Sequence, residues 1–111
     1  MHHRALRVAK LVKLELGKII ARDFDPEGAL LTITHVEVAE DLERAAVFVS
    51  ILPEEAAART LARLTKAAGS LQYALTKKLN IMPMPRITFA IDEGERNAAA
   101  VEKRLLEKEG L

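Results

Sequence analysis

The chain has 111 residues, of which 50% are hydrophobic and 30% are charged, and its formal net charge is +1. This length fits one domain with one hydrophobic core, and the absence of cysteine excludes disulfides, thiolate metal sites and cysteine nucleophiles. No uncharged stretch approaches the roughly 20 residues that a membrane-spanning helix needs, and lysines interrupt the N-terminal apolar pattern. We therefore expect neither a membrane span nor a signal peptide.

Residues 4–22 predict an amphipathic helix. Apolar residues recur along one face at three- and four-residue spacing, and basic residues gather on the opposite face. The apolar residues are Ala5, Val8, Ala9, Val12, Leu16, Ile19 and Ile20. The tetrapeptide Asp25-Pro26-Glu27-Gly28 then predicts a turn.

Two strands are expected after this turn. Residues 30–38 and 44–51 are rich in β-branched side chains, and the short polar link between them favours an antiparallel hairpin. Val47, Val49 and Ile51 alternate onto one face of the second strand. The first strand carries apolar residues on both faces, so the sequence leaves its inward face open.

Two helices and a strand complete the predicted order. A helix begins at Pro53, which suits a first helical turn, and Gly69 bends or ends it. A further helix covers about residues 70–80 and stops before Pro83. Residues 87–91 alternate in a last strand.

The order α-β-β-α-α-β predicts an α+β domain, in which helices pack on one face of a three-stranded sheet. We assign this domain to residues 1–96. Residues 97–111 are expected to form a C-terminal tail with a short, frayed helix that turns Val101 and Leu105 inward.

Charge is segregated along the chain although the net charge is close to zero. Residues 1–22 carry six basic residues and one acidic residue, residues 61–91 carry five basic residues, and no acidic residue occurs between Glu55 and Asp92. If the fold brings the two basic segments together, they form a surface for a polyanion. The alternative is that both are ordinary solvated helix faces.

Nothing in the sequence has the spacing of a catalytic or metal site. The three histidines do not form a His-Glu-x-x-His pattern, and no nucleophile is paired with a base. We therefore expect no enzyme activity, no cofactor and no metal. Tyr73 is the only aromatic residue in the basic region, which argues against a stacking platform and favours phosphate and shape recognition by lysine and arginine.

Short motifs of one known family are spread over most of the chain. They are Arg7-Val8-Ala9, Asp25-Pro26, Val36-Glu37-Val38, Asp41-Leu42, Ala46-Val47-Phe48-Val49-Ser50, Lys66-Ala67-Ala68-Gly69, Pro85 to Phe89, and Asp92. The most specific is the Ala-x-Gly of residues 67–69, which stands where other KH domains carry Gly-x-x-Gly. In the order and spacing of these motifs the chain resembles the ribosome-binding factor A family.

The resemblance implies a type II KH-like domain with an Ala-x-Gly kink between helices and no catalysis of its own. It implies binding to the free small (30S) ribosomal subunit, late processing of its 16S rRNA and a role in cold adaptation. It also implies a cytoplasmic monomer with ribosome-associated GTPases as possible partners. The chain departs from the family pattern at Glu27, where arginine is common, and at Gln72, Asn80 and Met82, where basic residues are usual.

We expect the first helix and the kinked helix pair to contact rRNA together. The predicted RNA-binding residues are Arg4, Arg7, Lys10, Lys66, Ala67, Ala68, Gly69, Lys77, Lys78 and Arg86. Gly69 either lets RNA approach the backbone closely or only bends the helix. Two other functions stay open, namely a generic KH-like module that reads single strands and a protein-interaction domain that uses the acidic segment 23–60.

Overall fold

The computed structural model describes residues 3–94, and the predicted tail helix lies outside these residues. The elements follow the chain in the order α1 (His3–Asp23), β1 (Leu30–Val38), β2 (Arg44–Leu52), the 3-10 turn η1 (Glu54–Ala56), α2 (Ala57–Leu79) and β3 (Arg86–Ile91). The strand predictions and the first helix are confirmed to within one or two residues.

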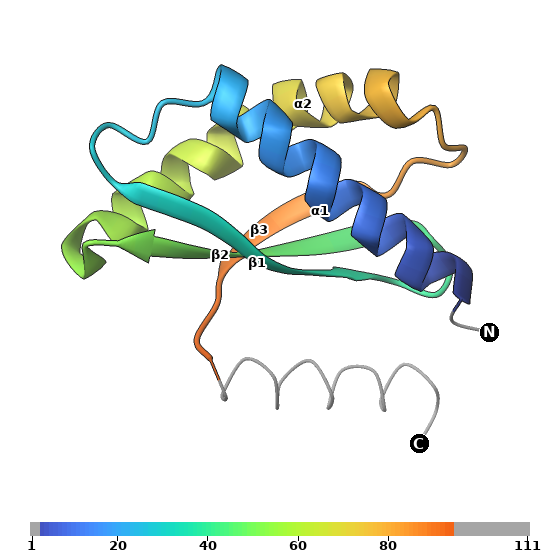
Figure 1. Cartoon of the computed structure of the whole chain (residues 1–111), viewed down its shortest axis with the longest axis horizontal. Coiled ribbons are helices and arrows are strands. Elements are labelled where there is room, and N and C mark those ends of the chain that lie inside the picture. The colour runs from blue at the N-terminus through green and yellow to red at the C-terminus, as the bar shows by residue number, and fades with distance from the viewer. Residues whose placement is uncertain (1–2, 95–111) are drawn as a thin grey trace.

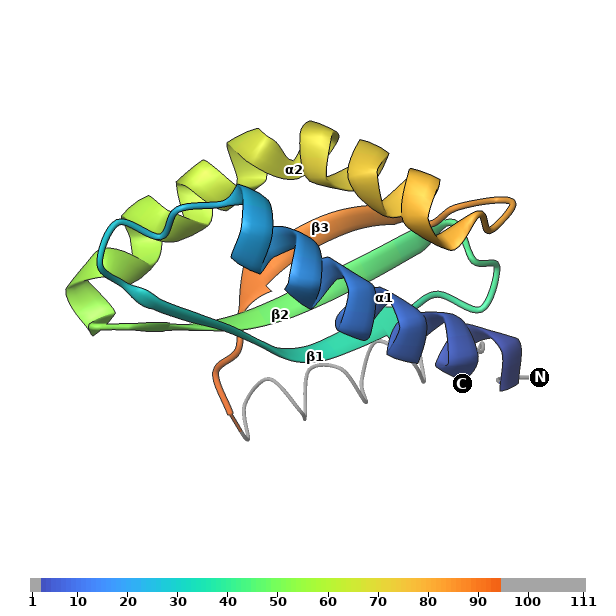
Figure 2. The same cartoon turned by 45° about the horizontal axis from the view of Figure 1, so that its top comes forward.

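The three strands form a mixed sheet in the order β1-β2-β3. β1 pairs antiparallel with β2, and β3 pairs parallel with β2. Both helices lie over the same side of the sheet (Figure 1, Figure 2). α1 packs mainly on β1 and α2 mainly on β3, and the helices also contact each other. The predicted α+β fold with helices on one face is therefore confirmed.

The core between the helices and the sheet is aliphatic. Its most deeply buried members each have a relative exposure of 0%, and they are Val12 and Leu16 of α1, Val47 and Val49 of β2, and Leu64 and Leu75 of α2. Burying one such side chain contributes about 1.5–3 kcal/mol. The stripe of α1 that the sequence predicts to be apolar is the stripe that faces this core.

A bulge in β1 explains why its inward face is ambiguous in the sequence. The pairing with β2 shifts register between Ile33 and His35. Before the shift Leu31 and Ile33 pack against the core, and after it Val36 and Val38 do so. Since one extra residue reverses the alternation of a strand, apolar residues at odd and then at even positions all reach the same face.

The two helices predicted around Gly69 form one helix, so the prediction of a separate third helix is corrected. α2 runs without interruption through Ala67, Ala68 and Gly69, and its ribbon changes direction about midway (Figure 1, Figure 2). A glycine inside a helix costs only about 1 kcal/mol relative to alanine, and the buried Leu64 and Leu71 on either side offset this cost. Of the two roles predicted for this glycine, bending agrees with the structure and ending the helix does not.

A side-chain contact ties the bulge of β1 to the end of β3. The Thr34 hydroxyl donates a hydrogen bond to the Asp92 carboxylate and also lies 3.3 Å from the carbonyl oxygen of Phe48. The backbone N–H of Gly94 donates to the other Asp92 oxygen at 2.8 Å. The Thr34 hydrogen bond, followed by that from Gly94, lowers the pKa of Asp92 below its ordinary value, while partial desolvation opposes the shift.

We predict that Thr34→Val lowers the free energy of unfolding at pH 7 by about 1 kcal/mol, the usual net value of one hydrogen bond. Because the pKa of Asp92 is lower in the folded protein, its contact stabilises the fold above about pH 4. That stabilisation is lost as the pH falls through the folded pKa. Urea denaturation at pH 7 and at pH 3 measures both effects.

Thr32→Val is the matched control, because Thr32 is an exposed threonine of the same strand and makes no side-chain hydrogen bond within residues 3–94. The two variants should differ at pH 7, and the difference should be smaller at pH 3. Equal stability of both variants at pH 7 would show that the Thr34–Asp92 contact contributes nothing.

Candidate nucleic-acid interface

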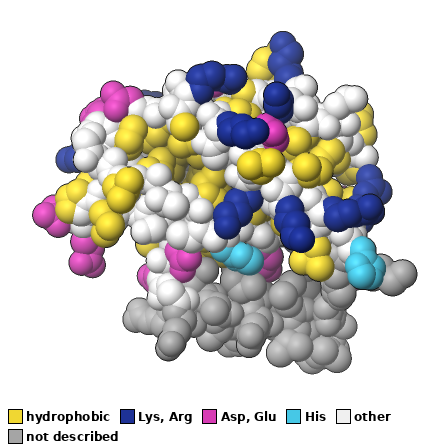
Figure 3. Space-filling model, viewed as in Figure 1, with side chains coloured by type: hydrophobic (Ala, Val, Ile, Leu, Met, Phe, Trp, Pro, Cys, Tyr) yellow, Lys and Arg dark blue, Asp and Glu magenta, His cyan; other side chains and the backbone are white. Residues whose placement is uncertain are grey.

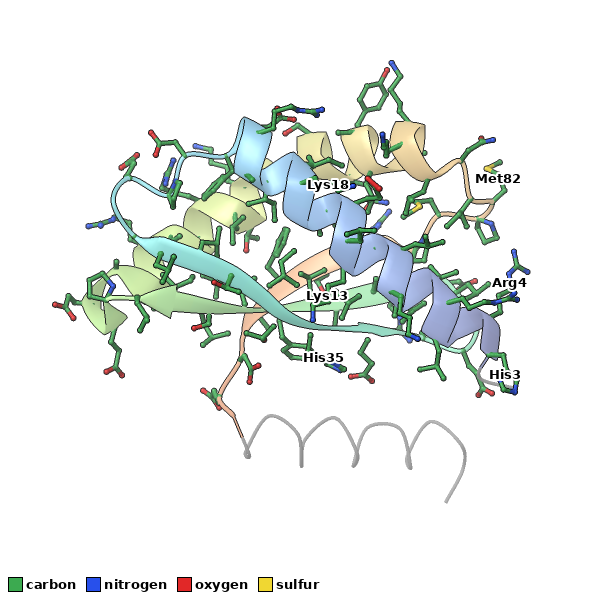
Figure 4. All side chains as sticks on the ribbon, viewed as in Figure 1. His3, Arg4, Lys13, Lys18, His35 and Met82 are labelled. Atoms are coloured by element: carbon green, nitrogen blue, oxygen red, sulfur yellow. The ribbon has the colours of Figure 1, made fainter. Side chains whose placement is uncertain are left out.

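The outward face of α1 is basic. Because the apolar stripe of the helix faces the sheet, the predicted residues Arg4, Arg7 and Lys10 are exposed to solvent. Lys13 and Lys18 are exposed on the same helix although they are absent from the predicted site (Figure 4). Figure 3 shows Lys and Arg side chains gathered on the face of the molecule that α1 crosses.

Each of the two additional lysines contacts one oxygen atom of the protein. The Lys13 ammonium lies 3.3 Å from the carbonyl oxygen of Thr34 on β1. Lys18 lies 3.5 Å from Glu15 one turn earlier, and 64% of its side chain is exposed. Exposed pairs of this kind contribute at most about 1 kcal/mol, so both lysines keep most of their capacity to attract an anion.

α2 contributes basic residues and no acidic ones. Lys66, Lys77 and Lys78 are exposed, and no ion pair among residues 3–94 neutralises them. Arg63 is different, because it lies 3.4 Å from Glu27 and its guanidinium stands 4.8 Å from the centre of the Phe24 ring. Lys77 and Lys78 lie in the last turn, where positive charge also stabilises the helix.

The fold brings the two basic segments to one layer. α1 and α2 contact each other and run in opposite directions, so the start of α1 and the last turn of α2 lie at the same end of the molecule (Figure 1, Figure 2). We call the exposed residues of this layer the helical basic face. Its members among the predicted site residues are Arg4, Arg7, Lys10, Lys66, Lys77 and Lys78.

Arg86 lies on the other side of the sheet. It is exposed at the start of β3, next to Arg44 of β2 in the strand register. Its neighbour Ile87 is 3% exposed and packs into the core. Because side chains alternate along a strand, Arg86 points away from the helices and is not part of the helical basic face.

Residues 67–69 lie inside one continuous helix, and this limits what they can bind. Backbone N–H groups in a helix interior are hydrogen-bonded to the carbonyl four residues earlier, so these amides cannot grip a phosphate as a glycine loop does. Ala67 and Ala68 are half-buried and Gly69 is exposed. A Cβ atom built on Gly69 would meet nothing within 4 Å. The surface at Gly69 is therefore open.

Gln72 has a structural role that the sequence did not reveal. Its side-chain N–H donates to the carbonyl oxygen of Pro85 at 2.8 Å, and its carbonyl oxygen accepts from the backbone N–H of Ile87 at 2.8 Å. Within residues 3–94, β3 is an edge strand and pairs with β2 alone. The Gln72 amide thus joins α2 to the side of β3 that faces away from β2. A lysine or arginine at this position could not accept the hydrogen bond from the N–H of Ile87, because these side chains have no acceptor group.

The hollow on the surface between α1 and β1 does not resemble a catalytic site. Its volume is about 260 Å³, and its lining residues are Gly17, Ile20, Ala21, Phe24, Pro26, Leu31 and Ile33. None of these side chains titrates or acts as a nucleophile. Across residues 3–94 no three His, Asp or Glu side chains are placed to hold a metal ion. None of the helices in that range is long and apolar enough to cross a membrane.

We predict that Gln72→Leu destabilises the protein by about 1–3 kcal/mol, because it leaves the N–H of Ile87 in β3 and the carbonyl oxygen of Pro85 just before β3 without their partner. The midpoint of urea denaturation measures the change. Tyr73→Leu, at the next position on the outward side of α2, is the control and should change the midpoint little. If both variants unfold at the same urea concentration, the Gln72 bridge does not stabilise β3.

We also predict that Gly69→Ala raises the free energy of unfolding by about 0.5–1 kcal/mol, because alanine loses less backbone entropy than glycine in a helix and meets no neighbour here. Gly17→Ala in α1 is the matched control, since a Cβ there also meets nothing within 4 Å. Thermal denaturation of both variants measures the gain. Destabilisation at position 69 alone would mean that the bend of α2 requires glycine.

Comparison with known proteins identifies the family of this chain. The family model described as ribosome-binding factor A matches residues 4–105. Ribosome-binding factor A of Nitrosococcus oceani is 37% identical over 106 residues, which cover 90% of this chain and 84% of that protein. The same factor from Akkermansia muciniphila is 32% identical over 93 residues, covering 84% and 74%.

Solved structures agree with this assignment. The crystal structure of ribosome-binding factor A from Thermus thermophilus has a TM-score of 0.70 at 26% identity, covering 78% of this chain and 94% of that chain. A homology model of the Thermus thermophilus factor, fitted into a cryo-EM map of a 30S–RbfA complex, has a TM-score of 0.63 at 29% identity, covering 74% and 88%. This chain therefore belongs to the ribosome-binding factor A family.

Proposed function

We propose that this protein binds the free small ribosomal subunit through its helical basic face and assists the late processing of 16S rRNA. Membership of the ribosome-binding factor A family supports the ribosome as the partner. The fit of a structurally similar factor into a 30S complex supports the small subunit. The observation that carries the proposal is that α2 has exposed lysines and no acidic residue, and lies beside the basic face of α1.

Recognition in this proposal depends on side chains. Lysine and arginine neutralise phosphates and release bound counterions, which makes affinity fall steeply with salt. The amides of residues 67–69 are engaged in the helix, so the glycine-loop grip of other KH domains is not used. Folded rRNA offers phosphates at fixed positions, and a rigid layer of two helices matches such a surface by shape and charge.

We further propose that the protein acts without catalysing a reaction. The protein acts by occupying the immature subunit, as a cytoplasmic monomer that works alongside ribosome-associated GTPases and supports growth in the cold. Arg86 contacts RNA separately from the helical basic face, because it lies across the sheet from the helices.

We predict that Lys77→Glu combined with Lys78→Glu weakens binding to purified small subunits. The change replaces two attractive charges by two repulsive ones in the last turn of α2. Losing two phosphate contacts should also reduce the slope of log K against log salt by about 1.4–1.8. Co-sedimentation with small subunits, large subunits and joined ribosomes across a salt series measures affinity, slope and selectivity.

A double variant of Arg44→Glu and Arg86→Glu is matched in charge and lies on the other side of the sheet. It should weaken binding less than the double variant of α2. If the α2 variant binds small subunits as tightly as the unchanged protein at every salt concentration, the helical basic face is not the contact surface.

Protein binding is the second candidate function, and one observation favours it. α1 exposes three leucines among its basic residues, namely Leu6 at 59%, Leu11 at 44% and Leu14 at 57%. Exposed apolar side chains within one helix face are typical of a contact with protein. Binding that persists at high salt and is lost on replacing Leu6 and Leu14 by serine would favour this function over phosphate recognition.

A further inference from the structure

Among the phenylalanine and tyrosine side chains, Tyr73 is the one that is exposed to solvent. The chain contains three phenylalanines, one tyrosine and no tryptophan. Phe48 is buried, and Phe24 and Phe89 are half-buried against the core. Tyr73 is 65% exposed, since it projects from the side of α2 opposite the buried Leu71 and Leu75.

One face of the Tyr73 ring already interacts with a cation. The ammonium group of Lys77, one turn later in α2, lies 5.0 Å from the centre of the ring. A lysine over an aromatic face is attracted by the electrons of the ring. The contact therefore holds a positive charge beside the ring, where the phosphate of a nucleotide stacked on that ring would need one.

The turn before Tyr73 carries no side chain at Gly69. Gly69 precedes Tyr73 by four residues, so both lie on the same face of α2, one turn apart. Gly69 is exposed, and a Cβ placed there would meet no atom within 4 Å. The surface one turn before Tyr73, on the side away from Lys77, is thus open. Lys66, one turn further back, supplies a second exposed positive charge.

We propose that Tyr73 stacks on one unpaired nucleobase of the bound RNA, with Gly69 leaving room for the base and with Lys77 and Lys66 neutralising the adjacent phosphates. An aromatic face with flanking cations is the combination by which proteins hold single-stranded nucleic acid. The complete lack of acidic residues from position 56 to position 91 favours RNA over a basic protein segment. A single ring holds a single base, so this contact is not a stacking platform.

This inference rests on the proposed function and adds the class of ligand at one position of the helical basic face. It is tested first by comparing Tyr73→Phe with Tyr73→Leu in binding to purified small subunits. Both substitutions keep the charge and a large apolar side chain, and only phenylalanine keeps an aromatic face. Stacking on one base predicts that Tyr73→Leu binds about 5- to 150-fold more weakly than Tyr73→Phe.

Gly69→Leu gives a second variant of the same site. It adds no charge, improves helix propensity and fills the open surface beside the ring. It should weaken binding to small subunits in the same range as Tyr73→Leu while leaving the folded state at least as stable. Small subunits that bind Tyr73→Leu and Tyr73→Phe equally well, while binding the unchanged protein, overturn the stacking contact and leave the proposed function standing.

The fluorescence of the protein provides a readout that does not depend on the ribosome. With one tyrosine and no tryptophan in the chain, its tyrosine emission comes from Tyr73 alone. A single-stranded RNA of about eight nucleotides, within the usual site sizes of such proteins, should quench this emission. An abasic strand of equal length carries the same phosphates and should not quench it.

Binding to small subunits tests the proposed function, and the fluorescence titration tests the stacking contact of Tyr73 independently. If the unchanged protein fails to bind small subunits, the proposed function is wrong, and the fluorescence titration alone decides the inference. In that case, quenching by RNA and not by the abasic strand supports stacking at Tyr73. Equal responses to both strands, or none, overturn it.

Discussion

The structure depends on the burial of aliphatic side chains from both helices against the same face of one sheet. The chain has few aromatic residues, so the interior is filled by valine, leucine and isoleucine from α1, α2 and β2. Each helix has one apolar stripe, and burying it turns the opposite stripe to solvent. The opposite stripes of both helices are basic, and the helices are neighbours. The helical basic face is therefore a direct consequence of where the core lies.

The continuity of α2 determines how this surface can recognise a polyanion. A helix that runs through residues 67–69 keeps the amide groups of these residues in its own hydrogen bonds. In the proposed function, the lysine and arginine side chains of the helical basic face make the contacts instead, and the lysines bring flexible point charges to phosphates without fixing a bidentate geometry. Such contacts tolerate sequence and respond strongly to salt. Gly69 leaves open surface on α2, and its backbone amide does not bind a phosphate in this proposal.

Polar side chains complete the fold at the two outer strands. Thr34 and Asp92 connect β1 with the end of β3, and Gln72 connects α2 with the start of β3. The Thr34–Asp92 contact passes over the central strand β2, since Thr34 also lies 3.3 Å from the carbonyl oxygen of Phe48. The Gln72 contact instead meets backbone groups of β3 on the side away from β2. Gln72 is uncharged although α2 is a basic helix, because its amide bonds to backbone groups at the start of β3. The positive charge of the helical basic face comes from residues that point outward.

The amino-acid sequence by itself determined the first helix, the three strands, the α+β arrangement, the segregation of charge and the family, because periodicity and motif spacing are local properties of a chain. Tertiary structure decided the rest. The inward face of β1 depends on a bulge after Ile33 that exists only in the pairing with β2. The continuity of α2 at Gly69 depends on packing that outweighs the cost of glycine in a helix. Gln72 bonds to partners 13 and 15 residues away. Arg86 is separated from the helices by the sheet. Both relations depend on the folded chain and cannot be predicted from local sequence.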